Sequence, residues 1–183
     1  MARVRQMRLF IAVAADEEVK AAAAAVVARL RALPADYRWV DPRDMHVTLE
    51  FFGEADAARQ AEIEGLLRAV AARTRPFEIV YGGVGAFDSL DDPRVVWLGL
   101  DEGLEPLARL AGALGYAEPR PFFAHLTLGR RRRAAAPEFS AALRAQPPLS
   151  LRRPVRALSL YASRPTSFGH AYDVLATAPL AGR

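Results

Sequence analysis

Two short stretches with the same pattern decide the fold of this chain: HVTLEFFG at residues 46–53 and HLTLGR at residues 125–130. Both begin with His-x-Thr-Leu, and one lies in each half of a 183-residue chain that contains only 3 histidines. Side chains alternate between the two faces of a β-strand, so the histidine and threonine of each stretch share one face. The apolar residues share the other face and anchor the strand in a core. The repeat therefore predicts a diverged duplication in which each half contributes one strand to a shared cleft.

The four polar residues of the repeat are candidates for phosphodiester chemistry. If the two strands face each other, His46, His125, Thr48 and Thr127 surround one small volume. An in-line attack on phosphorus needs a base and an acid, and histidine, with an unperturbed pKa of about 6.5, can serve as either. Threonine hydroxyls can donate hydrogen bonds to the non-bridging oxygens. Two histidines without nearby carboxylates or thiolates make a poor ligand set, so we expect neither a metal nor another cofactor.

The remaining pattern predicts an α+β fold with mainly antiparallel sheets. Helices are expected at residues 17–33, 56–73, 103–114 and 138–145, with Asp16 as an N-cap and Gly115 as a C-terminal stop. Strands are expected at residues 9–14, 46–52, 77–84, 95–100, 125–129, 155–162 and 171–176. A doubly wound parallel sheet would need a helix between most strands, which this order lacks. We expect two pseudo-symmetric lobes with outer helices around a central cleft, as a single domain over residues 1–183.

The composition excludes several classes of site. The chain has no cysteine, which rules out disulfides, zinc–thiolate sites and thiol nucleophiles, and suits the reducing cytoplasm where we expect the protein. No apolar run approaches the length of a membrane span, so we expect no membrane association. The net charge of +4 favours an anionic partner such as nucleic acid. Residues 9–14 are predicted to be a buried strand rather than part of a signal peptide, after a loose extension at residues 1–6.

The two motifs resemble the paired H-x-T-x motifs of the 2H phosphoesterase superfamily. MRLFIAV, VVWLGL, RPFFAHLTLGR and LSLYASR also resemble its RNA 2′,3′-cyclic phosphodiesterase branch, historically called 2′–5′ RNA ligases, across nearly the whole chain. This resemblance implies a bilobal fold with a central cleft. It also implies that His46 is the proton donor and His125 the proton acceptor. The sequence alone cannot assign these roles, because the two motifs are symmetric. Many relatives have proline before the second motif histidine, whereas this chain has Phe123 and Ala124.

By the same resemblance, His125 activates water to attack the cyclic phosphate and His46 protonates the departing 3′ oxygen. The product is an RNA end with a 2′-phosphate. Thr48 and Thr127 would bind the phosphoryl oxygens. The expected partners are RNA 3′ ends with a cyclic phosphate, or small cyclic nucleotides, and the protein is expected to be a monomer.

Several neighbouring residues are further candidates for substrate binding. Arg130 could clamp the phosphate, although strict alternation places it on the face opposite His125. Residues 131–133 extend it into an arginine run, either a solvated loop or a surface that attracts an RNA backbone. Phe52 and Glu50 share the face of His46, where Phe52 could stack on a base or ribose or pack in the core.

More distant candidates carry weaker signals. Tyr161 and Arg164 are candidates for substrate contact. Trp39 and Trp97 are expected in the core. His170 has no threonine two residues later and is expected to be structural or exposed.

The leading hypothesis is metal-independent hydrolysis of RNA 2′,3′-cyclic phosphate ends. Within the same chemistry, the alternatives are 2′–5′ linkages, as ligase or phosphodiesterase, and small cyclic phosphates such as ADP-ribose 1″,2″-cyclic phosphate. An alternative of another class is a non-catalytic RNA-binding module. Both histidines and both threonines are present, which disfavours that module, because binding alone would tolerate other polar residues there.

Overall fold

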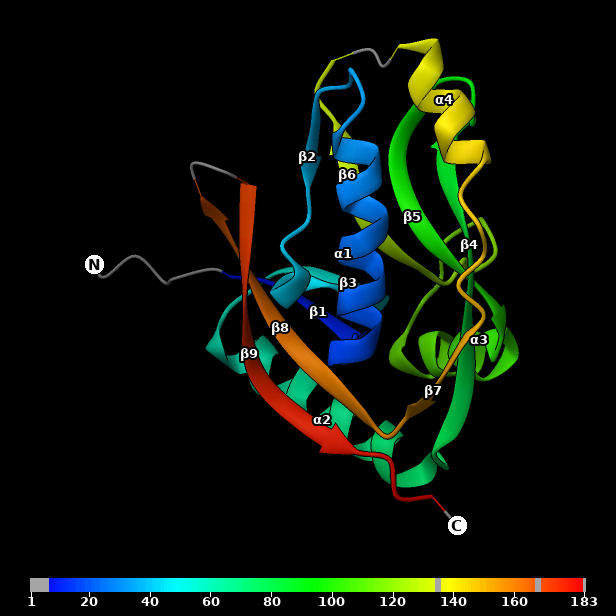
Figure 1. The fold of residues 1–183 in the computed structure, drawn as a ribbon. Helices are drawn as coiled ribbons and strands as arrows, with labels where there is room; N and C mark the ends of the chain where they lie inside the picture. Colours follow the sequence, from blue (N-terminus) through cyan, green and yellow to red (C-terminus); the bar gives the residue numbers. More distant parts are fainter. Residues whose placement is uncertain (1–6, 134–135, 167–168, 183) are drawn as a thin grey trace, which may run out of the picture.

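The structure of the protein is a computed structural model that describes residues 7–133, 136–166 and 169–182 (Figure 1). The elements in chain order are β1 (Met7–Ala14), α1 (Glu17–Arg31), β2 (Tyr37–Trp39), the 3₁₀ helix η1 (Pro42–Asp44), β3 (His46–Ala55), α2 (Ala57–Arg73), β4 (Phe77–Asp88), β5 (Pro93–Glu102), α3 (Leu104–Leu114), β6 (His125–Arg131), α4 (Pro137–Arg144), β7 (Leu151–Val155), β8 (Ala157–Thr166) and β9 (Gly169–Pro179). The loose extension expected at residues 1–6 lies outside the described residues.

Nine strands of the described chain form one curled sheet with the order β7-β4-β5-β6-β3-β1-β8-β9, and β2 pairs with β6. All the strand pairs are antiparallel. The order is symmetric about its centre: β5 and β6 pair across helix α3, as β1 and β3 pair across helix α1. The predicted α+β fold with two pseudo-symmetric halves is confirmed. That residues 1–183 form a single duplicated domain stays a prediction.

The two halves of the sheet meet at the repeated motifs. Val47 of β3 pairs with Leu126 of β6, and both side chains are 0% exposed. These are the variable residues of the two His-x-Thr-Leu phrases. An antiparallel register centred on this pair turns His46 toward Thr127 and His125 toward Thr48. The backbone pairing therefore brings the two predicted functional strands side by side.

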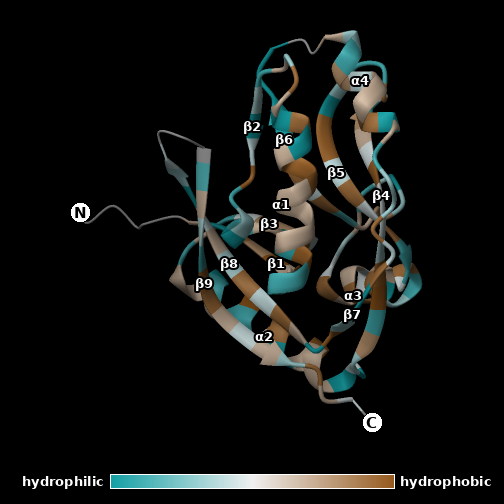
Figure 2. Cartoon of the chain, in the orientation of Figure 1, coloured by the Kyte–Doolittle hydropathy of each residue, from teal (hydrophilic) through white to brown (hydrophobic). Residues whose placement is uncertain are grey.

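The helices cover one face of the sheet and enclose the main core. Leu30 of α1, Leu67 of α2, Leu107 of α3 and Phe139 of α4 are fully buried and belong to one apolar cluster with alternate residues of the strands. Figure 2 shows apolar residues along α1 and β5. The opposite face of β1 carries a small separate cluster of Phe10, Ala12 and Tyr161. That second face is the one from which the motif histidines project.

Local sequence signals set the helix ends. The Asp16 carboxylate accepts a hydrogen bond from the Val19 backbone N–H at 3.0 Å, which confirms the expected N-cap of α1. Asp56 caps α2 in the same way through the N–H of Arg59. Gly115 ends α3 with a positive φ of 107°, a conformation in which glycine has no Cβ penalty.

Two parts of the sheet differ from the sequence prediction. The short strand β2 was not expected, because three residues carry too little periodicity to mark a strand. The strand expected at residues 155–162 is two strands: β7 pairs with β4 at one end of the sheet, and β8 pairs with β1 in the other half. The chain crosses between the halves at Arg156, which lies between the two strands. The sequence pattern does not reveal this crossing, because it does not show which distant strand each segment pairs with.

We expect Leu126→Ala to lower the free energy of unfolding by about 2–5 kcal/mol, because it leaves a cavity at the junction of the two halves. Denaturant unfolding measures this loss. The matched control is Leu104→Ala, since Leu104 on α3 is 46% exposed and its truncation should cost less than about 0.5 kcal/mol. Equal losses in both variants would contradict a central role for the Val47–Leu126 pair.

Candidate active site

A cleft of about 490 Å³ lies where the two halves of the sheet meet. Its walls include all four residues of the repeat: His46 and Thr48 from β3, and His125 and Thr127 from β6. All four side chains are half-buried. The structure therefore brings together the residues that the sequence repeat singled out.

A β-bulge brings Arg130 into the same cleft. Thr127 pairs with Trp97 of β5, but Gly129 pairs with Val96, so β6 contains one extra residue, Leu128. The extra residue reverses the alternation of side chains beyond it. Arg130 consequently shares the face of Thr127 and lines the cleft, whereas strict alternation would place it on the opposite face. The bulge needs glycine at position 129, because a Cβ there would lie 2.7 Å from the Trp39 ring.

The corresponding bulge in β3 overturns the expectation for Phe52. Thr48 pairs with Ala12 of β1, but Glu50 pairs with Ile11, so Leu49 is the extra residue. Beyond this bulge, Phe51 faces the cleft and is 46% exposed, while Phe52 packs against the main core. The prediction that Phe52 shares the face of His46 is therefore wrong, whereas Glu50 lines a second hollow together with Thr48 and His125. By the symmetry of the motifs, Phe51 holds in β3 the position that Arg130 holds in β6.

Each motif histidine is oriented by a backbone carbonyl two residues earlier. His46 Nδ1 lies 2.6 Å from the carbonyl oxygen of Asp44, and His125 Nδ1 lies 2.8 Å from that of Phe123. A carbonyl can only accept a hydrogen bond, so Nδ1 carries the proton in both rings. The Nε2 atom then bears the lone pair of the neutral ring and the second proton of the charged ring. Either histidine can thus act as a base or an acid through Nε2.

Each motif histidine packs against aromatic side chains from its own half of the sheet. The His46 ring lies against Phe10 at 4.8 Å, Tyr161 at 5.6 Å and Tyr172 at 5.2 Å between ring centroids. Tyr161 is 8% exposed, so it packs behind His46 rather than lining the cleft, whereas Tyr172 lines it. The expectation that Tyr161 contacts substrate directly is therefore not supported by its burial.

The His125 ring lies edge-on to Phe87 at 4.8 Å and is tilted against Phe123 at 5.9 Å between centroids. Phe123 lies two residues before the second motif histidine and is 51% exposed. It supplies both the carbonyl that orients His125 and an aromatic wall beside it. Phe123 thus gives the His125 ring a defined orientation.

Burial and positive neighbours lower the pKa of both histidines. Burial lowers the pKa of His46 to about 4; the hydrogen bond to Asp44 opposes this, and the nearby His125 and Arg130 add repulsion. The pKa of His125 is also lowered, first by burial and then by Arg130, against the hydrogen bond to Phe123. Without a bound anion the site therefore disfavours an imidazolium, and a negative phosphate beside the two rings would raise both pKa values.

The other residues singled out in the sequence fall in different places. Trp39 packs half-buried against the core, as expected. Trp97 does not, because it alternates with the buried residues of β5 and lines a separate hollow together with Phe123. His170 is exposed, as expected, but also lines the cleft, with Nδ1 3.0 Å from Ser163 Oγ.

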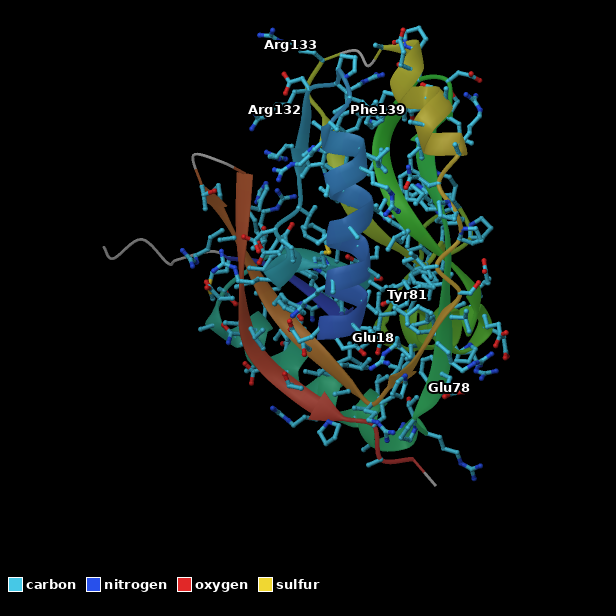
Figure 3. All side chains as sticks on the ribbon, in the orientation of Figure 1. Glu18, Glu78, Tyr81, Arg132, Arg133 and Phe139 are labelled. Atoms are coloured by element: carbon cyan, nitrogen blue, oxygen red, sulfur yellow. The ribbon has the colours of Figure 1, made fainter. Side chains whose placement is uncertain are left out.

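Three of the remaining arginine candidates form salt bridges, including Arg133, which lies 3.8 Å from a carboxylate oxygen of Asp36. Arg164 forms a salt bridge with Asp173 and does not line the cleft. Arg131 pairs with Asp92. Arg132 and Arg133 are exposed beyond the end of β6, and Figure 3 shows their side chains projecting from the upper end of the molecule.

The sequence reasoning missed several residues of the cleft. Arg8 and Phe10 come from β1, Arg38 from β2 and Tyr172 from β9. No motif marks them, because each is brought to the site by strand pairing with a distant segment. Phe51 lies inside the first quoted stretch, and Arg8 and Phe10 lie inside MRLFIAV, but the sequence analysis did not single them out as site residues. The face of Phe51 depended on a bulge that the sequence pattern does not reveal.

The described residues contain no cluster of three or more His, Cys, Asp or Glu side chains that could hold a metal ion. None of the helices in that part of the chain is long and apolar enough to cross a membrane.

Comparison with known proteins identifies the family. A family model described as "LigT like Phosphoesterase" matches residues 13–97. The RNA 2′,3′-cyclic phosphodiesterase of Archaeoglobus fulgidus is 38% identical over 134 residues, which are 69% of this chain and 74% of the relative. The protein of the same name from Thermus thermophilus is 32% identical over 188 residues, 96% of this chain and 91% of that one. The chain belongs to the LigT-like phosphoesterases.

Solved structures agree with this assignment. A Thermus thermophilus protein superposes with a TM-score of 0.83 at 30% identity, covering 96% of this chain and 99% of its own. E. coli LigT complexed with 3′-AMP gives a TM-score of 0.76 at 27% identity, covering 96% and 99%. The resemblance to the 2H phosphoesterases inferred from the two motifs is confirmed, and the protein is an enzyme. These comparisons therefore disfavour the alternative that this LigT-like phosphoesterase is a non-catalytic binding module.

We expect Arg130→Ala to raise the pKa of both His46 and His125, because it removes a positive charge that opposes protonation of each ring. Titration of the imidazole NMR signals measures both values. Adding inorganic phosphate to the unmodified protein should also raise them. The control is Arg75→Ala, which removes an exposed arginine outside the cleft and should change neither value. Unchanged histidine pKa values in Arg130→Ala would contradict this electrostatic coupling.

Proposed function

We propose that this LigT-like phosphoesterase hydrolyses 2′,3′-cyclic phosphates at RNA 3′ ends to 2′-phosphomonoesters, without a metal ion. The observation that carries the proposal is the pair of histidines, His46 and His125, in one cleft, each with Nδ1 bonded to a carbonyl and Nε2 left for chemistry. The name of the A. fulgidus and T. thermophilus relatives supports the substrate.

In the proposed reaction, a water oxygen attacks phosphorus while its proton passes to Nε2 of His125. The bond between phosphorus and the 3′ oxygen breaks, and Nε2–H of His46 gives its proton to that oxygen. The phosphate stays attached at the 2′ position. One proton is taken up and one released, so the two histidines exchange their protonation states and are restored through solvent.

We assign the binding of the non-bridging oxygens to Thr48, Thr127 and Arg130. The two hydroxyls lie on the histidine faces of their strands, where they can donate hydrogen bonds to the reacting phosphate. The Arg130 guanidinium supplies a positive charge that is already felt by both imidazoles. These donors would stabilise the charge that builds up on the equatorial oxygens in the transition state.

The lowered pKa values suit the proposed division of roles. His46 is strongly shifted, to about 4, so its imidazolium is a good proton donor once formed. The His125 ring is the other half of the pair and would accept the proton of water. In the free enzyme the protonated form of His46 is scarce near neutral pH. A bound anionic phosphodiester would raise its pKa and populate the form that can donate.

Phe51, rather than Phe52, becomes the candidate for contact with the ribose or base. It is exposed at the cleft and lies under the Arg8 guanidinium, 5.0 Å from ring centroid to Cζ. Tyr161 would act only indirectly, by supporting the His46 ring.

The alternatives within the same chemistry differ in what attacks or leaves the phosphorus. A 2′–5′ ligase or phosphodiesterase would use a ribose hydroxyl in place of water or as the leaving group, and ADP-ribose 1″,2″-cyclic phosphate would present the same strained ring on another sugar. The same two histidines can serve each reaction, so product analysis separates them. The monomeric state and the cytoplasmic location stay predictions.

We expect the protein to open an RNA 2′,3′-cyclic phosphate end in the presence of EDTA. His46→Ala and His125→Ala should each reduce kcat by about 10²–10⁴-fold, since each removes a general acid or base. Phosphate-specific NMR or chromatography of the product should find a 2′-phosphomonoester.

The control for this experiment is His170→Ala, which removes the third histidine and should cost less than about tenfold, because no proton transfer is assigned to it. Activity only after addition of a divalent metal would contradict the mechanism. Exclusive formation of 2′–5′ linked products would contradict the substrate assignment.

We expect a bell-shaped pH profile of kcat/KM, because catalysis needs one protonated and one neutral imidazole. The pKa values of both free histidines are lowered, so the proton that catalysis needs is lost as the pH rises through them, and the optimum should lie below about pH 6.5. The kcat profile should lie at higher pH, because bound phosphate raises both pKa values. Initial rates over a range of pH and substrate concentration give both profiles. A flat kcat/KM between about pH 5 and pH 9 would contradict paired acid–base roles.

A further inference from the structure

Two arginines face each other at one end of the cleft. Arg38 of β2 pairs directly with Arg130 of β6, and both line the cleft. Like charges directly opposite each other on neighbouring strands destabilise a sheet. Neither guanidinium forms a salt bridge with any of the described residues. The fold therefore concentrates uncompensated positive charge at this point.

Arginines outside the cleft have a different electrostatic environment. Many of them pair with a neighbouring carboxylate, including Arg94 with Asp88, Arg144 with Asp91, Arg152 with Glu102 and Arg153 with Asp16. Eleven described arginines outside the cleft form salt bridges, whereas none of the three that line it does so with a described residue. Burial raises the pKa of Tyr172, and the positive charges of Arg130, Arg38 and Arg8 act to lower it. All three charges therefore lie around this residue of the cleft wall.

The positive charge continues beyond the cleft, past the end of β6. Arg131 turns aside to pair with Asp92, but Arg132, the next residue, is exposed and forms no salt bridge among the described residues. Arg132 is the first residue after the end of β6, where its backbone N–H donates a hydrogen bond to the carbonyl oxygen of Asp36 at 2.8 Å. Figure 3 shows the Arg132 side chain on the side of β2 that faces β8 and β9, the strands that supply the other wall of the cleft.

The opposite end of the cleft has the reverse character. A second hollow shares Thr48, Phe51 and His125 with the cleft and is otherwise lined by aromatic rings, including Phe87 and Phe123, and by two carboxylates with one arginine. The carboxylates belong to Glu50 and Glu118, and the pKa of Glu50 is raised, first by burial and then by the charge of Glu118. This end suits an uncharged ring and repels phosphates.

We propose that Arg38 and Arg132 bind the phosphodiesters immediately 5′ of the terminal nucleotide, so that single-stranded RNA enters along the β2–β6 edge and its last base points toward Phe87 and Phe123. This inference rests on the proposed function. It goes beyond it by giving the strand a direction in the cleft and by making the enzyme selective for oligonucleotide ends over cyclic mononucleotides. Guanidinium groups bind phosphate through paired donors, and successive arginines match a backbone with one charge per nucleotide.

The test compares two substrates: adenosine 2′,3′-cyclic phosphate and the adenosine trinucleotide that ends in a 2′,3′-cyclic phosphate. The selectivity is the ratio of kcat/KM for the trinucleotide to that for the mononucleotide. Arg38→Ala should reduce this ratio about tenfold, because one charge-assisted phosphate contact is lost. The slope of log kcat/KM against log salt for the trinucleotide should flatten by about 0.7, the change for one phosphate contact to a single strand. Arg132→Ala should act in the same direction.

Two control variants separate charge at this edge from general effects. Arg75→Ala removes an exposed arginine between α2 and β4 and should leave the ratio unchanged. Arg38→Lys keeps the charge and should retain most of the salt slope, which a merely structural role of the side chain would not predict. Circular dichroism of each variant checks the fold.

The outcomes distinguish this inference from the function on which it rests. If the unmodified protein opens neither substrate, the proposed function is wrong. If it opens both but Arg38→Ala and Arg132→Ala leave the ratio and the salt slope as they were, the function stands and the phosphate-binding edge is refuted. An equal loss on both substrates also overturns the proposal, because Arg38 would then serve the reacting phosphate rather than the upstream chain.

Discussion

The contact between Val47 and Leu126 is the constraint on which the rest of the site depends. These two residues are fully buried and form the backbone pair that joins β3 to β6. Each is the variable residue of its own motif, so the motif histidines and threonines of the two halves must converge when they pair. A shift of one residue in this register would turn one motif face into the core. The packing of the core at this point therefore fixes the relative position of the two motif histidines.

A second constraint is the bulge that follows each motif. The extra residues Leu49 and Leu128 are both buried leucines of the repeated phrase, and each reverses the alternation beyond it. The same kind of bulge follows the motif in both halves, but it turns a different type of residue toward the cleft. It presents Phe51 to the cleft from β3 and Arg130 from β6. A symmetric scaffold thus becomes a site with an aromatic neighbour on one strand and a cationic neighbour on the other.

The electrostatic character of the cleft follows from these placements. Three histidines and three arginines line the cleft together with one aspartate, Asp44. Burial and repulsion lower the pKa of both imidazoles and so favour the neutral form. Each ring packs against aromatic side chains. A bound phosphodiester anion would offset the repulsion and raise the pKa of both imidazoles. The same charge imbalance that costs stability in the free enzyme therefore favours an anionic substrate.

The sequence by itself determined the α+β fold, the helix caps at Asp16 and Gly115, and the four motif residues, because helix ends and strand faces are encoded by local spacing. Only the tertiary structure decided that Phe51 and not Phe52 faces the cleft, and that Arg130 joins it. It also brought Arg38 and Tyr172 from strands without any motif. The physical reason is that bulges and strand order arise from pairing between distant segments, and alternation within one segment carries no information about its partner.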